Sequence, residues 1–420
     1  MKIDILLGLQ WGDEGKGKIV DALSPEYDLI ARFQGGPNAG HTIEFNRTKH
    51  ILHLIPSGIF REGRLNLIGN GVVLDPAVFK KEVETLGIPL EDVKKRLIIS
   101  KKAHLILPGH RILDAAYECM KGNSKIGSTL KGIGPAYTDK AGRNGLRVGD
   151  IMRGDFRNLY DRALKTHLKM AEGCSFEFDL ARFEEGWFEG VELLKQFTII
   201  NSEYLLNDLL RQNRKILAEG AQGTMLDVDF GSYPFVTSSN TISAGACTGL
   251  GVPPGHTGEV FGIFKAYCTR VGSGPFPTEL QDEISEEIRK KGNEYGSTTG
   301  RPRRCGWLDL PALKYAIMIN GVTKLFMMKA DVFSGFSTIK VCTSYISGGK
   351  ETSEVPFEYD SRVKPVYREF DGWKENLSET DDFNNLPTAL KQYVEFIESE
   401  TGVPVSVVST GPDRRQTLYR

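Results

Sequence analysis

The stretch Gly8-Leu9-Gln10-Trp11-Gly12-Asp13-Glu14-Gly15-Lys16-Gly17-Lys18 follows a short apolar run, residues 3–7, and precedes a helix-compatible segment that begins near Ile19. Glycines let a backbone turn approach an anion closely, and the unpaired N–H groups at the start of the next helix point at that anion. Lys16 and Lys18 add positive charge at the same place. The pattern predicts a phosphate-binding turn between a strand and a helix.

This turn differs from an ordinary P-loop. Residues 12–18 fit the spacing G-x-x-x-x-G-K, but Ile19 stands where a P-loop has the Ser or Thr that holds Mg²⁺. Asp13, inside the turn, is instead a candidate metal ligand or base. The alternative interpretation is a tight connection with exposed lysines.

A second loop, Gln34-Gly-Gly-Pro-Asn38-Ala-Gly40-His41-Thr42, follows another strand-like run, residues 29–33. It is uncharged apart from one titratable group, His41, which is either catalytic or structural. Together, the sequences GDEGKGK and GGPNAGHT closely resemble the adenylosuccinate synthetase family, ligases that join IMP and aspartate at the expense of GTP. The resemblance continues in the family's motif order over residues 5–414.

The composition is that of an ordinary globular protein, with 420 residues of which 40% are hydrophobic and 25% charged. The net charge of −1 provides no overall field to recruit nucleic acid or an anionic membrane. The six cysteines form no C-x-x-C pair, and no run of about 20 apolar residues occurs. Residues 231–258 carry no charge and are interpreted as a lining loop. We expect a cytoplasmic protein with no membrane span and no nucleic-acid partner.

Apolar runs alternate with helical segments along the chain, and several runs are apolar on both faces, as strands buried in a mainly parallel sheet must be. The runs are 3–7, 29–33, 65–68, 97–100, 215–218, 260–269, 324–328, 339–345 and 403–408. We predict an α/β fold with a large, mainly parallel central β-sheet flanked by helices and with GTPase-like nucleotide-binding loops at the strand carboxyl ends. We expect one domain, residues 1–420, with helical excursions around residues 100–212.

Three helices have start and stop signals. They are predicted between Asp75 and Gly87, between Asp309 and Gly321, and over residues 155–172.

Five motifs follow the ends of predicted strands. They are the glycine turn, Glu219-Gly-Ala-Gln222, Arg270-Val271-Gly272, Lys329-Ala330-Asp331 and Ser409-Thr410-Gly411. Ligands of open α/β sheets bind at the carboxyl ends of the strands. We therefore expect the five motifs to share one site.

Lys329-Ala330-Asp331 resembles the K-x-D part of the guanine-recognition motif of GTPases. A carboxylate accepts hydrogen bonds from guanine N1–H and the exocyclic amine, whereas adenine N1 is an acceptor and would be left unpaired. Sites that need a ligand's hydrogen bonds reject analogues lacking them by roughly 10⁴-fold. The alternative interpretation is that Lys329 and Asp331 are surface residues that happen to follow a strand. Ser409-Thr410-Gly411 matches the family's other base-binding loop.

Residues 296–304, Gly-Ser-Thr-Thr-Gly-Arg-Pro-Arg-Arg, form a small-residue loop that ends in three arginines. Arginine forks bind carboxylates and phosphates bidentately, although a solvated basic loop is the alternative. In the family this loop captures aspartate, with Arg301 also facing IMP and Arg303 the GTP side. Pro302 replaces an arginine seen in many relatives.

Residues 127–135 and Arg143 form another anion-compatible stretch, for which a glycine-rich hairpin is the alternative. The resemblance implies that Thr129 binds the IMP phosphate and that Arg143 reaches the IMP of a neighbouring subunit, so a homodimer is expected. Gln222 and Thr237 match further IMP contacts of the family.

The resemblance also implies a mechanism. Asp13 takes the N1 proton of IMP, and O6 attacks the γ-phosphate of GTP to form 6-phosphoryl-IMP, from which the aspartate amine displaces phosphate. Mg²⁺, held by Asp13 and the Gly40 carbonyl, would offset charge together with Lys16. Gln222 would hydrogen-bond the developing O6 anion, and His41 would act as general acid.

The site residues implied by the resemblance fall into five groups. The catalytic residues are Asp13, Lys16, His41 and Gln222. The GTP-binding residues are Gly12, Asp13, Glu14, Gly15, Lys16, Gly17, Lys18, Gly40, His41, Thr42, Arg303, Lys329, Ala330, Asp331, Ser409, Thr410 and Gly411. The IMP-binding residues are Asp13, Glu14, Gly15, Lys16, Asn38, Ala39, Gly40, His41, Thr129, Arg143, Gln222, Thr237 and Arg301. The aspartate-binding residues are Ser297, Thr298, Thr299, Gly300, Arg301, Pro302 and Arg303, and the metal ligands are Asp13 and Gly40.

Two other functions compete with the ligase. A regulatory GTP-binding switch would use the glycine turn and the K-x-D motif but would need no IMP pocket or dicarboxylate loop. An RNA-binding module would rest on the arginines at 301–304, although the near-zero net charge and the absence of a stacking motif argue against it.

Overall fold

A ten-stranded sheet forms the centre of the molecule, and all its neighbouring strands are parallel except β19 and β20. The computed structural model describes residues 2–46, 48–122, 127–174, 178–296 and 300–420. In spatial order the strands are β20 (Thr417–Tyr419), β19 (Val405–Ser409), β15 (Lys324–Met328), β11 (Thr257–Lys265), β1 (Ile3–Gly8), β10 (Ile216–Glu219), β2 (Leu29–Arg32), β5 (Leu65–Ile68), β7 (Leu97–Ser100) and β9 (Thr198–Ile200). The predicted fold class is confirmed.

The strands at the middle of this sheet are buried on both faces. On β1, Ile5 and Leu7 pack into one core cluster and Leu6 into another, so neither face of the strand meets water. Helices on both sides provide this cover, as expected for parallel strands joined by crossovers.

Twelve helices accompany the strands in the part of the chain that the structure describes. They are α1 (Lys16–Leu23), α2 (Pro76–Thr85), α3 (Leu90–Arg96), α4 (Pro108–Met120), α5 (Ile133–Gly142), α6 (Phe156–Met170), α7 (Leu180–Leu194), α8 (Ser202–Arg211), α9 (Ser243–Leu250), α10 (Glu283–Gly292), α11 (Leu310–Asn320) and α12 (Thr388–Thr401). The three helices predicted from their end signals are confirmed as α2, α11 and α6. Asp75 and Asp309 cap α2 and α11, because each carboxylate accepts backbone N–H groups of the first turn.

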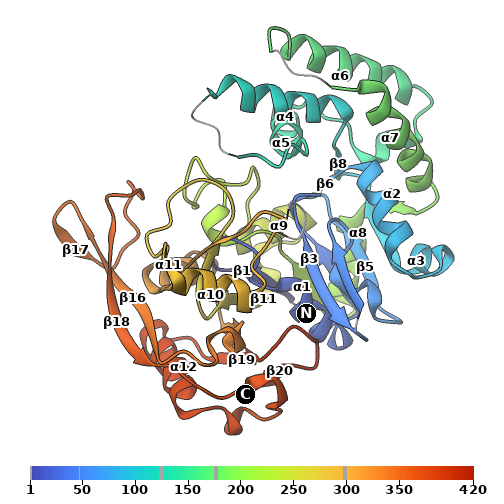
Figure 1. Ribbon diagram of the computed structural model, residues 1–420. Coiled ribbons are helices and arrows are strands. Elements are labelled where there is room, and N and C mark those ends of the chain that lie inside the picture. The colour runs from blue at the N-terminus through green and yellow to red at the C-terminus, as the bar shows by residue number, and fades with distance from the viewer. Residues whose placement is uncertain (1, 47, 123–126, 175–177, 297–299) are drawn as a thin grey trace.

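Helices α4, α5, α6 and α7 gather at one end of the molecule beside α2 (Figure 1). Three buried side chains join them. Both His110 on α4 and His167 on α6 donate from Nε2 to the same oxygen of Asp139 on α5, at 2.9 and 2.8 Å. This joint holds three helices of the excursion together.

Four smaller sheets lie outside the central one. The strands β3 (His41–Phe45) and β4 (Thr48–Leu52) form a hairpin, β6 (Val73–Leu74) pairs with β8 (His104–Leu105), and β12 (Cys268–Arg270) pairs with β13 (Arg304–Gly306). The fourth contains β14 (Leu308–Asp309), β16 (Thr338–Ser347), β17 (Lys350–Thr352) and β18 (Lys364–Asp371), and it projects to the left in Figure 1.

The predicted strand 260–269 is wrong in one respect, because it is two strands. The side chain of Gln10 accepts a hydrogen bond from the Lys265 N–H at 3.0 Å and donates to the Tyr267 carbonyl at 2.9 Å. These bonds occupy backbone groups that a continuing ladder would need, so β11 ends at Lys265 and β12 pairs elsewhere.

Two further predictions need correction. Residues 339–345 form a strand, but it is β16 of the four-stranded sheet, which pairs with β14 in parallel and with β17 and β18 antiparallel, and it does not join the central sheet. Residues 231–258 are not simply a loop, because they contain α9 and the start of β11. No described helix is long and apolar enough to cross a membrane.

Four of the five motifs lie where parallel strands of the central sheet end, after β1, β10, β15 and β19. The fifth does not. Arg270 ends β12, and its buried guanidinium donates to Ser232 Oγ and to the carbonyls of Phe235, Ser273 and Pro275. It therefore holds neighbouring loops together, and four motifs share the sheet edge.

Candidate active site

The turn after β1 is held in shape by Glu14. Its Oε1 accepts the N–H groups of Gln10 and Gly12 at 3.1 and 3.0 Å, and its Oε2 pairs with Lys16. Gly15 is the N-cap of α1 with φ 99°, a conformation that strongly favours glycine. Glu14 is thus committed to the turn, and α1 begins with its N–H groups facing the loops of the other motifs.

The two lysines of the turn reach different motifs. The Lys16 ammonium donates to the Gln222 carbonyl after β10. The Lys18 ammonium donates to Ser409 Oγ and the Gly411 carbonyl, each at 2.7 Å, in the loop after β19. Burial lowers the pKa of Lys18 to about 7, against the opposing effect of Asp331.

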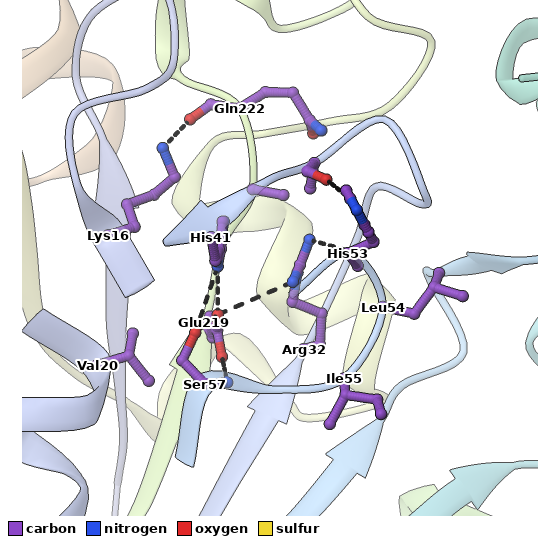
Figure 2. A network of polar contacts seen from close by, with 12 residues as sticks. Lys16, Val20, Arg32, His41, His53, Leu54, Ile55, Ser57, Glu219 and Gln222 are labelled. Carbon is purple, nitrogen blue, oxygen red and sulfur yellow. Dashed lines mark hydrogen bonds and ion pairs between the residues drawn. The ribbon is translucent and has the colours of Figure 1, made fainter. Parts of the chain in front are cut away.

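His41 begins β3 and lies against α1, where a side chain at Gly17 would collide with it. Its Nδ1 is 2.5 Å from Glu219 Oε1 (Figure 2). Burial lowers the pKa of His41 to about 4, with a further contribution from Arg32 that the Glu219 hydrogen bond opposes. In this structure His41 is therefore neutral near pH 7.

Asp13 lies next to the arginine-containing loop. Its Oδ2 is 2.8 Å from Arg303 Nε, and Arg303 NH1 is 2.5 Å from Glu294 Oε2. Glu294 is fully buried and also accepts from Lys265 at 2.8 Å and Tyr267 at 2.5 Å. The structure thus brings the turn and the 296–304 loop together. Ser297, Thr298 and Thr299 lie outside the described residues, and Gly300, Arg301 and Pro302 are exposed.

The K-x-D motif follows β15. Lys329 has φ 64° and donates to the Gly292 carbonyl at the end of α10, at 2.7 Å. Desolvation raises the pKa of Asp331, although Lys329 opposes this effect. The motif therefore contacts the end of α10, and the charge of Asp331 acts on Lys18, which bonds the loop after β19.

The segment that carries Thr129 and Arg143 reaches the site from the helical end. Lys131 donates to the Pro37 carbonyl at 2.7 Å, and the Tyr137 hydroxyl accepts from the Gly35 N–H at 3.0 Å. These contacts join the segment to the 34–42 loop. Thr129 and Arg143 themselves are exposed, and residues 133–142 form α5, so the hairpin alternative is wrong. Thr237 is half-buried near the Leu226 carbonyl, to which its N–H donates.

Several of these motifs carry buried polar atoms without a protein partner, as do positions elsewhere in the described chain. Within the described residues they include Asn38 Oδ1, His41 Nε2, both amide atoms of Gln222, Asp331 Oδ1 and Thr410 Oγ1. Native proteins rarely bury polar groups unpaired, because each costs about 1–3 kcal/mol. These atoms are suited to a ligand that carries several hydrogen-bonding groups.

The predicted Mg²⁺ ligands fit that ion chemically, since Asp13 and Gly40 offer a carboxylate and a carbonyl oxygen. The His110, Asp139 and His167 cluster is different. The Leu107 N–H donates to His110 Nδ1 at 3.0 Å, so neutral His110 carries its proton on Nε2 and donates it to Asp139. Its two imidazole nitrogens do not suit Mg²⁺, which prefers oxygen ligands, and its hydrogen bonds join α4, α5 and α6.

Sequence reasoning assigned no role to Glu219, Glu294 or Lys265. All three are fully buried. Glu219 and Lys265 each end an apolar strand, where a charge is a signal because a buried charge requires a partner. Glu294 follows the charged helix α10, so no such signal marks it.

Comparisons with known proteins agree with this site. The adenylosuccinate synthetase family model matches residues 5–418. An adenylosuccinate synthetase of Parabacteroides distasonis is 59% identical over 420 residues, which cover 100% of this chain and 99% of the relative. That of Christiangramia forsetii is 58% identical with both chains fully covered.

A solved structure gives the same result. The fully ligated adenylosuccinate synthetase of Plasmodium falciparum superposes with a TM-score of 0.93 at 37% identity, with both chains fully covered. The regulatory GTPase alternative finds no support among these relatives. The chain belongs to the adenylosuccinate synthetase family, GTP-dependent ligases that form adenylosuccinate from IMP and L-aspartate.

Proposed function

We propose that the loops after β1, β2, β10, β15 and β19 form one active site for this ligation, in which GTP, IMP and L-aspartate yield GDP, phosphate and adenylosuccinate. The observation that carries the proposal is the set of buried, unpartnered polar atoms on Asn38, His41, Gln222, Asp331 and Thr410. A purine nucleotide pair supplies donors and acceptors for such a set, whereas a purely structural edge would leave it unsatisfied.

The chemistry requires these groups together. The 6-oxo group of IMP is part of an amide-like system, so its oxygen leaves poorly until it has been phosphorylated. Asp13 would take the N1 proton while O6 attacks the γ-phosphate of GTP, and Gln222 would hydrogen-bond O6 as its charge develops. Lys16 would offset charge on the transferring phosphoryl group. The aspartate amine then displaces phosphate from C6.

Asp13 and the Gly40 carbonyl would hold Mg²⁺ in this scheme. When bound, the ion would neutralise charge on the phosphates of GTP. Asp13 now pairs with Arg303, so this arginine would exchange its carboxylate partner for an anionic group of GTP or aspartate. The rest of that substrate contact is assigned to residues 297–302.

Guanine recognition is assigned to Asp331, with Lys329, Ser409 and Thr410 shaping its pocket. The unpartnered Asp331 Oδ1 supports this role, since guanine offers two adjacent N–H donors. Lys18 would act by tying α1 to the same loop.

We also propose a homodimer in which exposed Arg143 reaches the IMP phosphate of the partner subunit beside Thr129. Its place at the C-terminal end of α5, with φ 63°, would present the guanidinium outward. The 420 residues would act as one domain, because strands from both chain ends share the central sheet. Six free cysteines are compatible with a cytoplasmic location.

The test is GTP consumption together with purine absorbance, with Mg²⁺ present and with IMP or aspartate omitted in turn. Asp13 has φ 59°, which Asn tolerates better than Ala, so Asp13→Asn removes the charge with less backbone strain than Asp13→Ala. Both signals should require all three substrates and should vanish in Asp13→Asn. Equal GTP turnover without IMP and aspartate would refute the proposal in favour of a GTPase switch.

A further inference from the structure

We infer that Glu219 is the positioning residue for His41: it fixes the plane of the imidazole and holds a ring proton on Nδ1, so that Nε2 is the ring nitrogen left to face the ligands. This inference rests on the proposed function only for the consequence in catalysis. The tautomer itself follows from the contacts described below.

Glu219 is completely buried at the end of β10 and its carboxylate oxygens have separate partners. Oε1 is 2.5 Å from His41 Nδ1 and accepts the Ser57 hydroxyl at 2.7 Å. Oε2 accepts the Ser57 backbone N–H at 2.8 Å. Figure 2 shows these bonds converging on the carboxylate from the β3 and residue-57 sides.

The charge of Glu219 is retained in this setting. Burial alone would raise its pKa, but the His41 hydrogen bond, Arg32 and Ser57 together lower it. Arg32 NH1 lies 3.8 Å from Oε1, and both side chains are buried. An ionised carboxylate only accepts hydrogen bonds, so His41 must donate from Nδ1 to Oε1.

The other ring nitrogen of His41, Nε2, has a different environment. His41 Nε2 is buried and has no protein hydrogen-bond partner among the described residues. A Cβ at Gly17 would lie 2.8 Å from His41 Cβ, so glycine at this position lets α1 pack closely against His41. Any proton that passes between His41 and a bound ligand must therefore pass through Nε2.

Ser57 should fix the orientation of the side-chain amide in Glu219→Gln, so this substitution has a defined effect on His41. The Ser57 backbone N–H requires an acceptor at the Oε2 position, so the amide oxygen of Gln must occupy it. The NH₂ group then lies at the Oε1 position and donates to His41 Nδ1 and to Ser57 Oγ. His41 is forced to carry its proton on Nε2, which reverses the tautomer without changing the size of the side chain.

The test combines histidine ¹⁵N NMR with steady-state kinetics on the full-length protein. The His41 signals are identified by their loss in His41→Asn. We expect Nδ1–H in the wild type, Nε2–H in Glu219→Gln, and a fall in kcat of about 10- to 100-fold, as for residues that orient a catalytic group. The KM values for IMP and GTP should change by less than about threefold, because no ligand contact is lost.

Two variants separate positioning from loss of structure. Glu82→Gln is the matched control, because Glu82 is also buried but, among the described residues, accepts hydrogen bonds from the backbone N–H groups of residues 53–55 alone. It should leave the His41 tautomer unchanged. Ser57→Ala removes one bond to Glu219 without a charge change and should lower kcat less than Glu219→Gln does.

An unchanged His41 tautomer in folded Glu219→Gln would overturn the inference, as would an unchanged kcat. So would equal losses of kcat in Glu219→Gln and Glu82→Gln. If Glu219→Gln does not fold, an unchanged kcat in Ser57→Ala would overturn it. Failure of the proposed function would be seen separately, as wild-type GTP turnover that needs neither IMP nor aspartate.

Discussion

Arg303 connects Asp13 to Glu294, with its Nε 2.8 Å from Asp13 Oδ2 and its NH1 2.5 Å from Glu294 Oε2. One guanidinium therefore joins the turn after β1 to the residue that follows the end of α10. Glu294 also holds Lys265, and neither of these two side chains is exposed to water. The arrangement keeps Arg303 beside Asp13 through a carboxylate that no ligand needs to touch.

Glu294→Gln should destabilise the protein strongly. The substitution leaves Lys265 and Arg303 without their shared carboxylate, and removal of one partner of a buried ion pair costs about 3–5 kcal/mol. The midpoint of urea unfolding should fall accordingly, and the KM for aspartate should rise in the folded fraction because Arg303 loses its anchor. Glu283→Gln, at an exposed position on α10, is the control and should change neither value. Equal midpoints for the two variants would show that the Glu294 cluster contributes no net stability.

Lys18→Met should weaken guanine nucleotide binding more than IMP binding. Lys18 makes three hydrogen bonds to residues 409–416, and all three join α1 to the loop beside Asp331. If the less ordered loop weakens the free energy of GDP binding by about 1.4 kcal/mol, GDP affinity falls about tenfold. Isothermal titration with GDP and with IMP measures both affinities, and exposed Lys49→Met serves as control. A larger effect on IMP than on GDP would contradict the assignment of this loop.

His104→Gln should reduce the acid sensitivity of folding. Burial, with Lys140 and Arg147 nearby, lowers the pKa of His104 to about 4 from a usual value of 6.5. Below pH 6.5 the unfolded chain therefore binds a proton that the folded chain refuses, so stability falls as the pH falls towards 4. Between pH 6.5 and 5 the free energy of unfolding should therefore fall by roughly 1–2 kcal/mol less in His104→Gln than in the wild type. Urea unfolding at several pH values measures this free energy, and His256→Gln, at an exposed position, is the comparison. If the free energy of unfolding changes with pH equally in His104→Gln and the wild type, His104 is not the cause.

Asp139→Asn should loosen the joint of α4, α5 and α6. One carboxylate oxygen accepts Nε2–H bonds from both His110 and His167, and an amide oxygen at the same place carries no negative charge, so both bonds should weaken. Because α5 ends at Arg143, IMP affinity should fall more than GDP affinity. Asp161→Asn, on the exposed face of α6, is the control. If IMP affinity is retained while unfolding occurs more easily, the joint supports stability alone and does not position Arg143.

Local signals in the sequence were sufficient for much of the fold. The strands β5, β7 and β15 have the predicted bounds, and Asp75 and Asp309 cap the helices expected of them. These signals succeed because burial on both faces and end-capping depend on residues close together in the chain. The run 260–269 failed for the converse reason, because Gln10, 255 residues away, ends β11.

The sequence by itself determined the family, the glycine turn between β1 and α1 and the motifs at four strand ends, since each is a contiguous pattern of residue types. Only the tertiary structure decided which side chains meet. His41 and Glu219 are 178 residues apart, Asp13 and Arg303 are 290 apart, and Lys18 and Ser409 are 391 apart. Such hydrogen bonds need atoms placed within tenths of an ångström, and that placement comes from the order of strands in the central sheet, which no local pattern specifies.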